Sequence, residues 1–411
     1  MQTRDYHLIG PDGRPFFWLA DTAWNLWCRG EPADWDGYLS HRSRQGFNVV
    51  QFVAGWWRGC TQPIHGRPFD LEGGKLVYNP AAWASLDRLF DRIAAHGLVA
   101  APINLWTLTD VDPGKVLSEE QCVEVAKRQV ERWDGPNVVW MLGGDGDYTS
   151  PDADARWKRI GRAVFGDRPE TVATMHPCGT TWVGQAFATE PWYRIATIQS
   201  GHGSSESDLK FLVDEGYAHA WKRLQMPFLN LEPNYEDARS YGARLHLKAY
   251  HVRRASYWSL LVAPPAGVTY GNGSVWMWAQ REGEVAENHD ESWVGKPWSA
   301  QMSTPGTRSM TVLRRFFESL PWTELRPAPE LVADQPGNRD VRRWLAAART
   351  RDGSLVVVYS PTVQTVDVVD GGAYRWRAVD PSDGRGFPFE GMGRLTPPTK
   401  QGDALLVGEL R

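Results

Sequence analysis

Short apolar runs alternate with longer amphipathic stretches from the N-terminus to Pro321. Runs without polar alternation predict strands buried on both faces, and the stretches between them predict covering helices. Eight such units favour a closed (β/α)₈ TIM barrel over an open doubly wound sheet. The expected strands are residues 16–21, 48–53, 98–106, 137–142, 171–176, 195–199, 228–231 and 268–270.

The expected helices lie between these strands, and glycine marks several of their ends. Gly46 and Gly97 follow two of the amphipathic stretches directly, as is typical of a helix C-terminus. No G-x-G-x-x-G motif follows the first strand, which weakens a nucleotide-binding alternative. The expected helices include residues 35–45, 81–96, 119–133, 207–220 and 241–261.

The sequence changes character after Pro321. Pro327 and Pro329 mark a linker, and short strands with turns such as Asp352-Gly353 follow. This pattern predicts a barrel over residues 1–321 and a small antiparallel β-sandwich domain over residues 322–411. The expected C-terminal strands are residues 341–348, 355–359, 363–369, 374–379 and 404–410.

The charge balance restricts the class of partner. Lys and Arg total 45 against 49 Asp and Glu, a formal charge of −4, which gives no footprint for nucleic acid or an anionic membrane.

Four scattered cysteines without metal-ligand spacing indicate free thiols in a reducing compartment. No secretory signal pattern follows Met1, so we expect a cytoplasmic protein, or an exported one if a leader has been trimmed. The oligomeric state is left open.

The chain contains 22 tryptophans. An indole ring is bulky, and it also offers a flat face that can stack on the C–H surface of a sugar. For any single Trp, packing in the core is the more common role. The candidates for stacking platforms are Trp24, Trp56, Trp57, Trp106 and Trp276.

Polar side chains follow many of the predicted strands. In a (β/α)₈ barrel the C-terminal strand ends meet at one mouth, where reactive side chains project. Carboxylate, amide and imidazole groups gathered there predict a pocket that hydrogen-bonds a polyhydroxylated ligand. The candidate binding residues at strand ends are Asp21, Gln51, Asn104, His176, Gln199, His202 and Tyr270, and Asn272 follows the last of these.

Two carboxylates stand out among the strand ends. Asp145 follows an apolar run and a Gly-Gly pair, and Glu232 follows an apolar run and precedes Pro233. These are strands four and seven, which face each other across the mouth. Glycoside cleavage needs such a pair, one group protonating the leaving oxygen and the other attacking the anomeric carbon or activating water. Asp147, two residues after Asp145, is the main rival for the acid.

The sequence gives less support to metal-dependent, esterase or protease chemistry. His176 and His202 are conceivable metal ligands with Asp21, but the H-x-H pair of barrel amidohydrolases is missing after the first strand. We therefore expect no metal and no cofactor. No G-x-S-x-G elbow supports an esterase, and neither H-E-x-x-H nor a Cys-His signature supports a protease. A non-catalytic carbohydrate-binding protein on the same scaffold is the alternative that remains.

Seven segments together resemble one family, the apiosidase-like glycoside hydrolases (family 140), whose members have also been described as collagenases. The tail after Trp322 resembles the small β domain that usually follows, sometimes labelled collagen-binding. The matching segments are residues 16–24 (FFWLADTAW), 42–51 (RSRQGFNVVQ), 139–145 (VWMLGGD), 198–203 (IQSGHG), 231–237 (LEPNYED), 254–258 (RASYW) and 269–271 (TYG).

The resemblance implies an exo-acting enzyme that removes a terminal sugar, with apiose from a pectic side chain as the characterised case. By the family pattern, Asp145 is the acid/base and Glu232 the nucleophile of a retaining mechanism, while Asp21 and the histidines bind the sugar. Residues 55–60 and 179–192 depart from that pattern, so the sugar, its anomeric configuration and the aglycone are left open.

Overall fold

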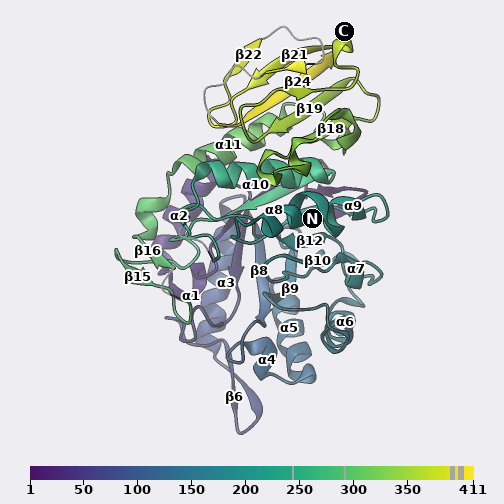
Figure 1. Ribbon diagram of the computed structural model, residues 1–411. Coiled ribbons are helices and arrows are strands. Elements are labelled where there is room, and N and C mark those ends of the chain that lie inside the picture. Colours follow the sequence, from purple (N-terminus) through teal and green to yellow (C-terminus); the bar gives the residue numbers. More distant parts are fainter. Residues whose placement is uncertain (243–244, 291–292, 389–393, 397–401) are drawn as a thin grey trace.

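The computed structural model describes residues 1–411 except 243–244, 291–292, 389–393 and 397–401 (Figure 1). Eight parallel strands form one curled sheet that resembles a TIM barrel. The last parallel strand along the chain pairs with the first, where Tyr270 lies opposite Asp21. In order around the sheet the eight are β10 (Ala173–Thr174), β9 (Trp140–Gly144), β8 (Val99–Trp106), β5 (Val49–Val53), β4 (Trp18–Thr22), β14 (Pro265–Tyr270), β13 (Phe228–Asn230) and β12 (Ala196–Gln199).

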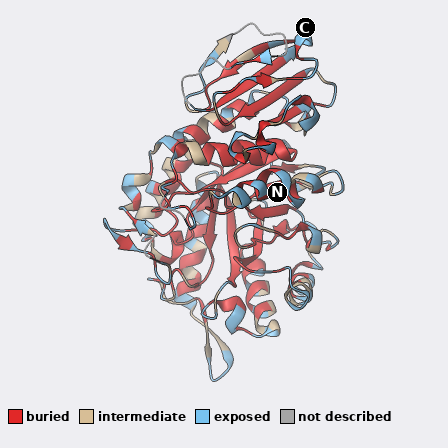
Figure 2. Ribbon diagram, viewed as in Figure 1, coloured by how far each residue is buried: buried red, intermediate tan, exposed pale blue. Residues whose placement is uncertain are grey.

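The two ends of the curled sheet meet at Ala173. A parallel bridge joins Ala173 to Tyr193, and the Arg194 amide donates to the Ala173 carbonyl at 2.9 Å. A short strand, β11 (Thr181–Trp182), pairs antiparallel with β12 at this edge. The strands are buried along their length, whereas the helices expose their outer faces (Figure 2).

The helices begin and end where proline, capping residues and glycine predict. The Asn79 side chain accepts from the first amides of its helix, and Gly46 and Gly97 adopt positive φ after two helices. Residues 119–133 form a helix with the predicted bounds. The longer helices around the barrel are α2 (Pro32–Arg44), α3 (Pro80–Ala95), α5 (Glu119–Trp133), α6 (Pro151–Phe165), α8 (Glu206–Asp214), α10 (Ala249–Val262) and α11 (Pro305–Glu318).

Two predicted helices were wrong in extent. The stretch 207–220 is split, because Glu215 is extended and a second short helix starts at Gly216. The stretch 241–261 becomes helical at Ala249; Gly242 turns the chain with φ 64°, and residues Arg239 and His246 pair antiparallel instead. Residues 243–244 of that prediction lie outside the described residues.

The barrel also carries short helices and strands that the apolar pattern did not predict. They are β1 (Gln2–Arg4), β2 (His7–Ile9), β3 (Pro15–Phe16), α1 (Leu26–Arg29), β6 (Phe69–Glu72), β7 (Lys75–Tyr78), α4 (Pro113–Val116), α7 (Gly184–Phe187), α9 (Gly216–Ala220), β15 (Glu284–Val285) and β16 (Val294–Gly295). Across the described residues, we find no helix with the length and apolar character that a bilayer crossing requires.

The C-terminal segment forms one six-stranded antiparallel sheet and a separate two-stranded pair. The larger sheet runs β17 (Leu325–Pro327), β18 (Ala346–Thr350), β19 (Leu355–Ser360), β24 (Ala404–Leu410), β21 (Tyr374–Val379) and β22 (Gly386–Pro388), and the pair is β20 (Val366–Asp367) with β23 (Arg394–Leu395). Residues 341–343 of the first predicted strand form a 3₁₀ turn instead. The Arg253 guanidinium of α10 binds Asp403 at 2.8 Å, both buried, and so ties this segment to the barrel.

Candidate active site

A pocket of about 240 Å³ lies at the C-terminal ends of the barrel strands. Asp145 follows β9 directly, and Glu232 follows β13 after one further residue. Both carboxylates reach the pocket wall. Its lining consists of Trp24, Trp57, Arg58, Trp106, Asp145, Gln199, His202, Glu232, Tyr235, Tyr241, Trp276, Asn288, His289, Asp290 and Trp293.

The Gly-Gly pair before Asp145 is required by close packing. A Cβ on Gly143 would lie 2.3 Å from the Tyr148 hydroxyl oxygen, and one on Gly144 would lie 2.6 Å from the Trp106 ring. Tyr148 also donates to the Gly144 carbonyl at 2.9 Å. The turn therefore presents Asp145 from a fixed backbone.

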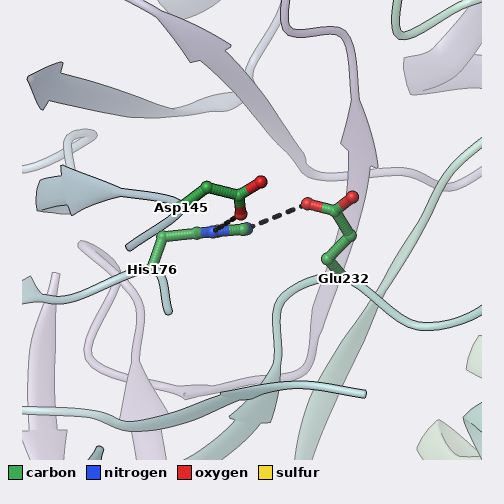
Figure 3. Close-up of side chains that lie close together, drawn as sticks. All are labelled: Asp145, His176 and Glu232. Atoms are coloured by element: carbon green, nitrogen blue, oxygen red, sulfur yellow. Dashed lines mark ion pairs between the residues drawn. The ribbon is translucent and has the colours of Figure 1, made fainter. Parts of the chain in front are cut away.

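The imidazole of His176 lies between the two carboxylates (Figure 3). Its Nδ1 is 3.4 Å from an Asp145 oxygen, and its Nε2 is 3.3 Å from a Glu232 oxygen. One oxygen of each carboxylate and one ring nitrogen all lie within 4.8 Å of one another. The ring follows β10 and is fully buried.

A second histidine contacts Glu232. His202 Nε2 is 3.0 Å from Glu232 Oε1, and the His202 ring packs on Tyr235 with centroids 4.2 Å apart. Burial lowers the pKa of His202 to about 3, so the ring is neutral at physiological pH. A neutral ring can donate to Glu232 from Nε2 in one tautomer, which favours an ionised Glu232.

Burial and the neighbouring charge of Asp145 raise the pKa of Glu232 to about 8, and His176 and the Tyr235 hydroxyl oppose that rise. Two carboxylates this close titrate as a pair, because ionising one makes the second ionisation harder. At neutral pH the pair therefore holds about one proton.

We expect Glu232→Gln to stabilise the fold at alkaline pH. The folded protein holds a proton on Glu232 more tightly than the unfolded chain, whose ordinary value is 4.5, so wild-type stability falls as pH rises towards about 8. Glutamine does not titrate. The gain in free energy of unfolding should be near zero below pH 4.5 and exceed about 1 kcal/mol at pH 9, since one pKa unit corresponds to ~1.4 kcal/mol. Urea unfolding at both pH values measures it, and an equal gain at both would contradict it.

Several predicted site residues meet in this pocket. Besides Asp145 and Glu232, the lining contains the predicted residues Trp24, Trp106, Gln199, His202 and Trp276, and the stacking candidate Trp57. His176 lies behind the lining, in contact with both carboxylates. Asp147 is exposed, and its Oδ1 accepts from the Thr149 amide and hydroxyl, so Asp145 rather than Asp147 faces Glu232.

Besides His176, five predicted binding residues lie outside the pocket lining, and each side chain contacts other parts of the protein. Gln51 donates to the Leu231 carbonyl, Asn104 to Gln129, and Trp56 to the Phe69 carbonyl. These contacts are made within the barrel wall and the loops behind the pocket. The remaining two are Tyr270, which donates to Glu236 at 2.7 Å, and Asp21.

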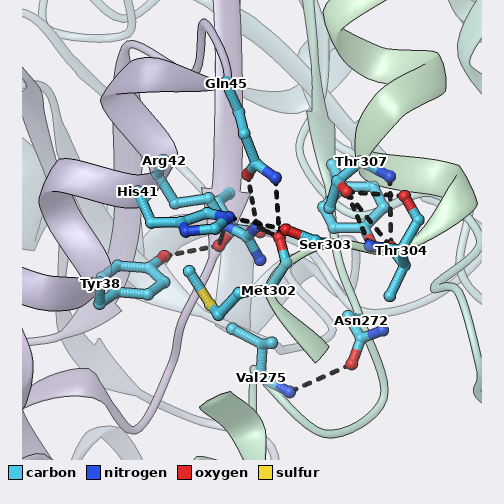
Figure 4. Close-up of polar contacts among 12 residues, drawn as sticks. Tyr38, His41, Arg42, Gln45, Asn272, Val275, Met302, Ser303, Thr304 and Thr307 are labelled. Carbon is cyan, nitrogen blue, oxygen red and sulfur yellow. Dashed lines mark hydrogen bonds and ion pairs between the residues drawn. The ribbon is translucent and has the colours of Figure 1, made fainter. Parts of the chain in front are cut away.

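Asp21 forms a buried ion pair with Arg42. The Arg42 Nε lies 2.6 Å from Asp21 Oδ2, and Tyr38 donates to the same oxygen at 2.6 Å. Arg42 also donates to the Met302 carbonyl at 2.9 Å and so ties α2 to the segment before α11 (Figure 4). Both charged side chains are completely buried. Asp21 therefore holds the scaffold behind the pocket.

Asp21→Ala should destabilise the protein by about 3–5 kcal/mol, because it leaves the buried guanidinium of Arg42 without its carboxylate. Its KM should stay within about twofold of wild type in the protein that folds, since the side chain does not line the pocket. Denaturant unfolding and steady-state kinetics measure the two effects. A large rise in KM with unchanged stability would restore Asp21 as a sugar ligand.

Residues that the sequence did not single out come mainly from the loop between β15 and β16. Asn288, His289, Asp290 and Trp293 belong to it. The Asn288 side chain donates to the Arg58 carbonyl at 2.9 Å, which joins this loop to the one after β5. His289 and Trp293 are the residues in the sequence of that segment that could have indicated a place in the site. Arg58, Tyr235 and Tyr241 complete the missed set.

Asp145, His176 and Glu232 form the one group among the described residues whose spacing would suit a small cation. The two ring nitrogens, however, face different carboxylates, Nδ1 towards Asp145 and Nε2 towards Glu232. That arrangement suits a proton shared between the ring and the carboxylates better than it suits a bound ion. The expectation of no metal site stays a prediction.

Residues 2–324 match the family model described as the apiosidase-like catalytic domain. Two solved structures resemble the whole chain, each with a TM-score of 0.82. One is a glycoside hydrolase family 5 protein from Bacteroides vulgatus, 22% identical, covering 98% of this chain and 91% of that one. The other is described as a glycoside hydrolase, 24% identical, covering 98% and 95%. Among curated proteins no sequence match is found.

Proposed function

The chain belongs to the apiosidase-like family and is a glycoside hydrolase, and from that premise we propose that it removes a terminal sugar with retention of anomeric configuration. Asp145 and Glu232 are the proposed acid/base and nucleophile. The position of each, one or two residues beyond the C-terminal end of a barrel strand, agrees with where barrel enzymes carry reactive groups.

The separation of the two carboxylates carries this proposal. One oxygen of Asp145 and one of Glu232 lie within 4.8 Å. Retaining glycosidases hold their carboxyl groups about 5–5.5 Å apart, whereas inverting enzymes need about 6.5–9.5 Å to admit a water molecule between base and sugar. The short separation supports direct attack by a carboxylate.

In the first step ionised Glu232 attacks the anomeric carbon, and the bond to the leaving oxygen breaks as that oxygen takes the proton of Asp145. Glu232, now an ester, carries no charge, and the ionised Asp145 carboxylate can accept a proton from water. The water oxygen attacks the anomeric carbon, the ester to Glu232 breaks, and both groups return to their starting states.

The size of the pocket supports action on a chain end. About 240 Å³ is below the roughly 300–1,000 Å³ of pockets that hold drug-sized ligands. The loops carrying Arg58 and Asn288 contact each other beside it. A terminal sugar and part of its neighbour fit such a space better than the middle of a polymer. Trp24, Trp106 and Trp276 are the proposed stacking surfaces.

We divide the chain into a (β/α)₈ catalytic barrel over residues 1–321 and a C-terminal β-sandwich domain over residues 322–411. Buried Val366 and Leu395 from the two-stranded pair share a hydrophobic cluster with Val356 and Leu406 of the larger sheet. This contact supports two packed layers. The C-terminal domain would then cover α10 and stabilise the barrel.

Hydrolysis of a panel of aryl glycosides and plant or bacterial oligosaccharides by wild type, Asp145→Ala and Glu232→Ala tests the proposal. We expect the wild type to release one sugar from chain ends and both variants to be nearly inactive. Variants as active as wild type would refute the assignment of the pair. Binding without release by the wild type would favour a carbohydrate-binding protein.

A further inference from the structure

We propose that His176 is a positioning residue that couples the protonation of Asp145 and Glu232, so that the pair shares one proton through the imidazole. This inference rests on the proposed function and deepens it. It replaces the sequence-based expectation that His176 binds the sugar.

The surroundings of the ring support coupling rather than sugar binding. His176 is fully buried and does not line the pocket. The Trp24 ring packs edge-on against it at 5.1 Å, and the Trp106 ring lies 6.1 Å away, so indoles separate it from the pocket. Its backbone amide donates to the Gly143 carbonyl at 2.9 Å, which ties it to the turn before Asp145.

Each ring nitrogen faces a carboxylate, and neither nitrogen has a hydrogen-bond partner among the described residues. Nδ1 faces Asp145 at 3.4 Å and Nε2 faces Glu232 at 3.3 Å, slightly longer than hydrogen bonds. Catalytic hydrogen bonds are often long in a free enzyme and tighten when substrate binds. Buried polar atoms without partners are costly, so small shifts that complete both contacts are favourable.

A neutral imidazole has one N–H and one lone pair. It can donate to one carboxylate and accept an O–H from the other, but it cannot satisfy two ionised carboxylates or two protonated carboxyls equally well. The bridge therefore stabilises the state in which the pair holds one proton, the state that glycoside cleavage requires.

Two arrangements meet this condition. In one, Nδ1–H donates to ionised Asp145 and the Glu232 O–H donates to Nε2. When the Glu232 proton moves to Nε2 and the Nδ1 proton moves to Asp145, the ring is again neutral, Glu232 is ionised and Asp145 is protonated. That second arrangement is the reactive one, and donation from His202 Nε2 to Glu232 favours it.

The charged and titratable groups around the cluster are few. Asp145 and Glu232 face the His176 ring itself, from the loops after β9 and β13, and the aromatic rings of Trp24 and Trp106 pack near it. Other titratable groups lie near the carboxylates: Tyr148 and Cys178 beside Asp145, and His202, Tyr235, Tyr241, Arg58, His289 and Asp290 on the pocket wall. Their charges are the same in the variants below.

His176→Phe tests the coupling, because phenylalanine keeps the ring and removes both nitrogens. We expect KM within about twofold of wild type, kcat lower by at least about tenfold, and both limbs of the pH profile of kcat/KM shifted inward by at least about half a unit. The midpoint of the acidic limb moves to higher pH and that of the alkaline limb to lower pH, because the singly protonated pair loses its bridge. If His176 instead bound the sugar, the variant would have a higher KM and an unchanged pH profile. That result would overturn the inference.

A second variant and a control keep the test decisive. His176→Asn has one amide, which reaches one carboxylate at a time, so it should narrow the profile as well if the phenylalanine variant does not fold. His7→Phe removes another buried imidazole, one that packs on Trp322 outside the pocket lining, and should leave the profile unchanged. If Asp145→Ala and Glu232→Ala are inactive but His176→Phe keeps the wild-type profile, the inference alone fails; if those two stay active, the proposed function fails.

Discussion

Glu232→Ala is expected to lower kcat by about 10⁴-fold or more on every substrate that the wild type cleaves, because removal of a nucleophile abolishes the covalent route. Glu232 has the burial and contacts of a nucleophile: the residue is 5% exposed, and its carboxylate lies 3.0 Å from His202 Nε2. Steady-state kinetics on an aryl glycoside measures the loss. The fold should persist, since the variant removes a group whose ionisation opposes folding.

Azide provides the positive control for that variant. The anion fits the space left by the carboxylate and attacks the anomeric carbon itself, giving a glycosyl azide of opposite configuration to the substrate. Glu287→Ala is a matched control, because Glu287 is exposed on the loop beside the pocket and contacts Thr61. It should retain wild-type activity. A Glu232→Ala variant within tenfold of wild type would contradict the assignment.

Asp145→Ala is expected to lower kcat by about 10²–10⁴-fold on natural substrates, the usual contribution of a positioned acid. The loss should depend on the leaving group. An activated phenol departs without a proton, so its release should be much less impaired, and the enzyme should then accumulate the glycosyl ester on Glu232. Kinetics on a series of aryl glycosides measures this dependence.

Azide again distinguishes the role of the residue. It needs no base, so it should speed turnover of the activated substrate and give a glycosyl azide of the same configuration as the substrate. Asp147→Ala is the matched control, since Asp147 is exposed and bonded to Thr149. A loss that is equal for all leaving groups would remove Asp145 from the role of acid. A larger loss in Asp147→Ala would give that role to Asp147.

Much of the barrel could be predicted because its strands are apolar on both faces and its helices carry local end signals. Pro80 with Asn79 begins one helix, and Gly97 follows its end, all within a few residues. The helix predicted before α10 was wrong for the reverse reason: Gly242 turns the chain there, and antiparallel pairing between Arg239 and His246 prevails over helical periodicity. Periodicity cannot reveal such pairing.

The two carboxylates of the site could be identified because each directly follows an apolar strand, one after Gly143-Gly144 and one before Pro233. Asp21 has the same kind of position, yet its partner Arg42 lies a helix away, and no local pattern indicates that ion pair. Likewise, nothing near Asn288 in the sequence shows that its loop reaches Arg58 across the pocket. Tertiary contacts of this kind need the folded structure.

The anomeric configuration of the first sugar released tests the central claim most directly. Proton NMR follows hydrolysis of a glycoside of known configuration by the wild type, with spectra recorded before the free sugar mutarotates. Two displacements, first by Glu232 and then by water, predict that the sugar appears first in the configuration of the substrate. A sugar that appears first in the opposite configuration would contradict covalent attack by Glu232.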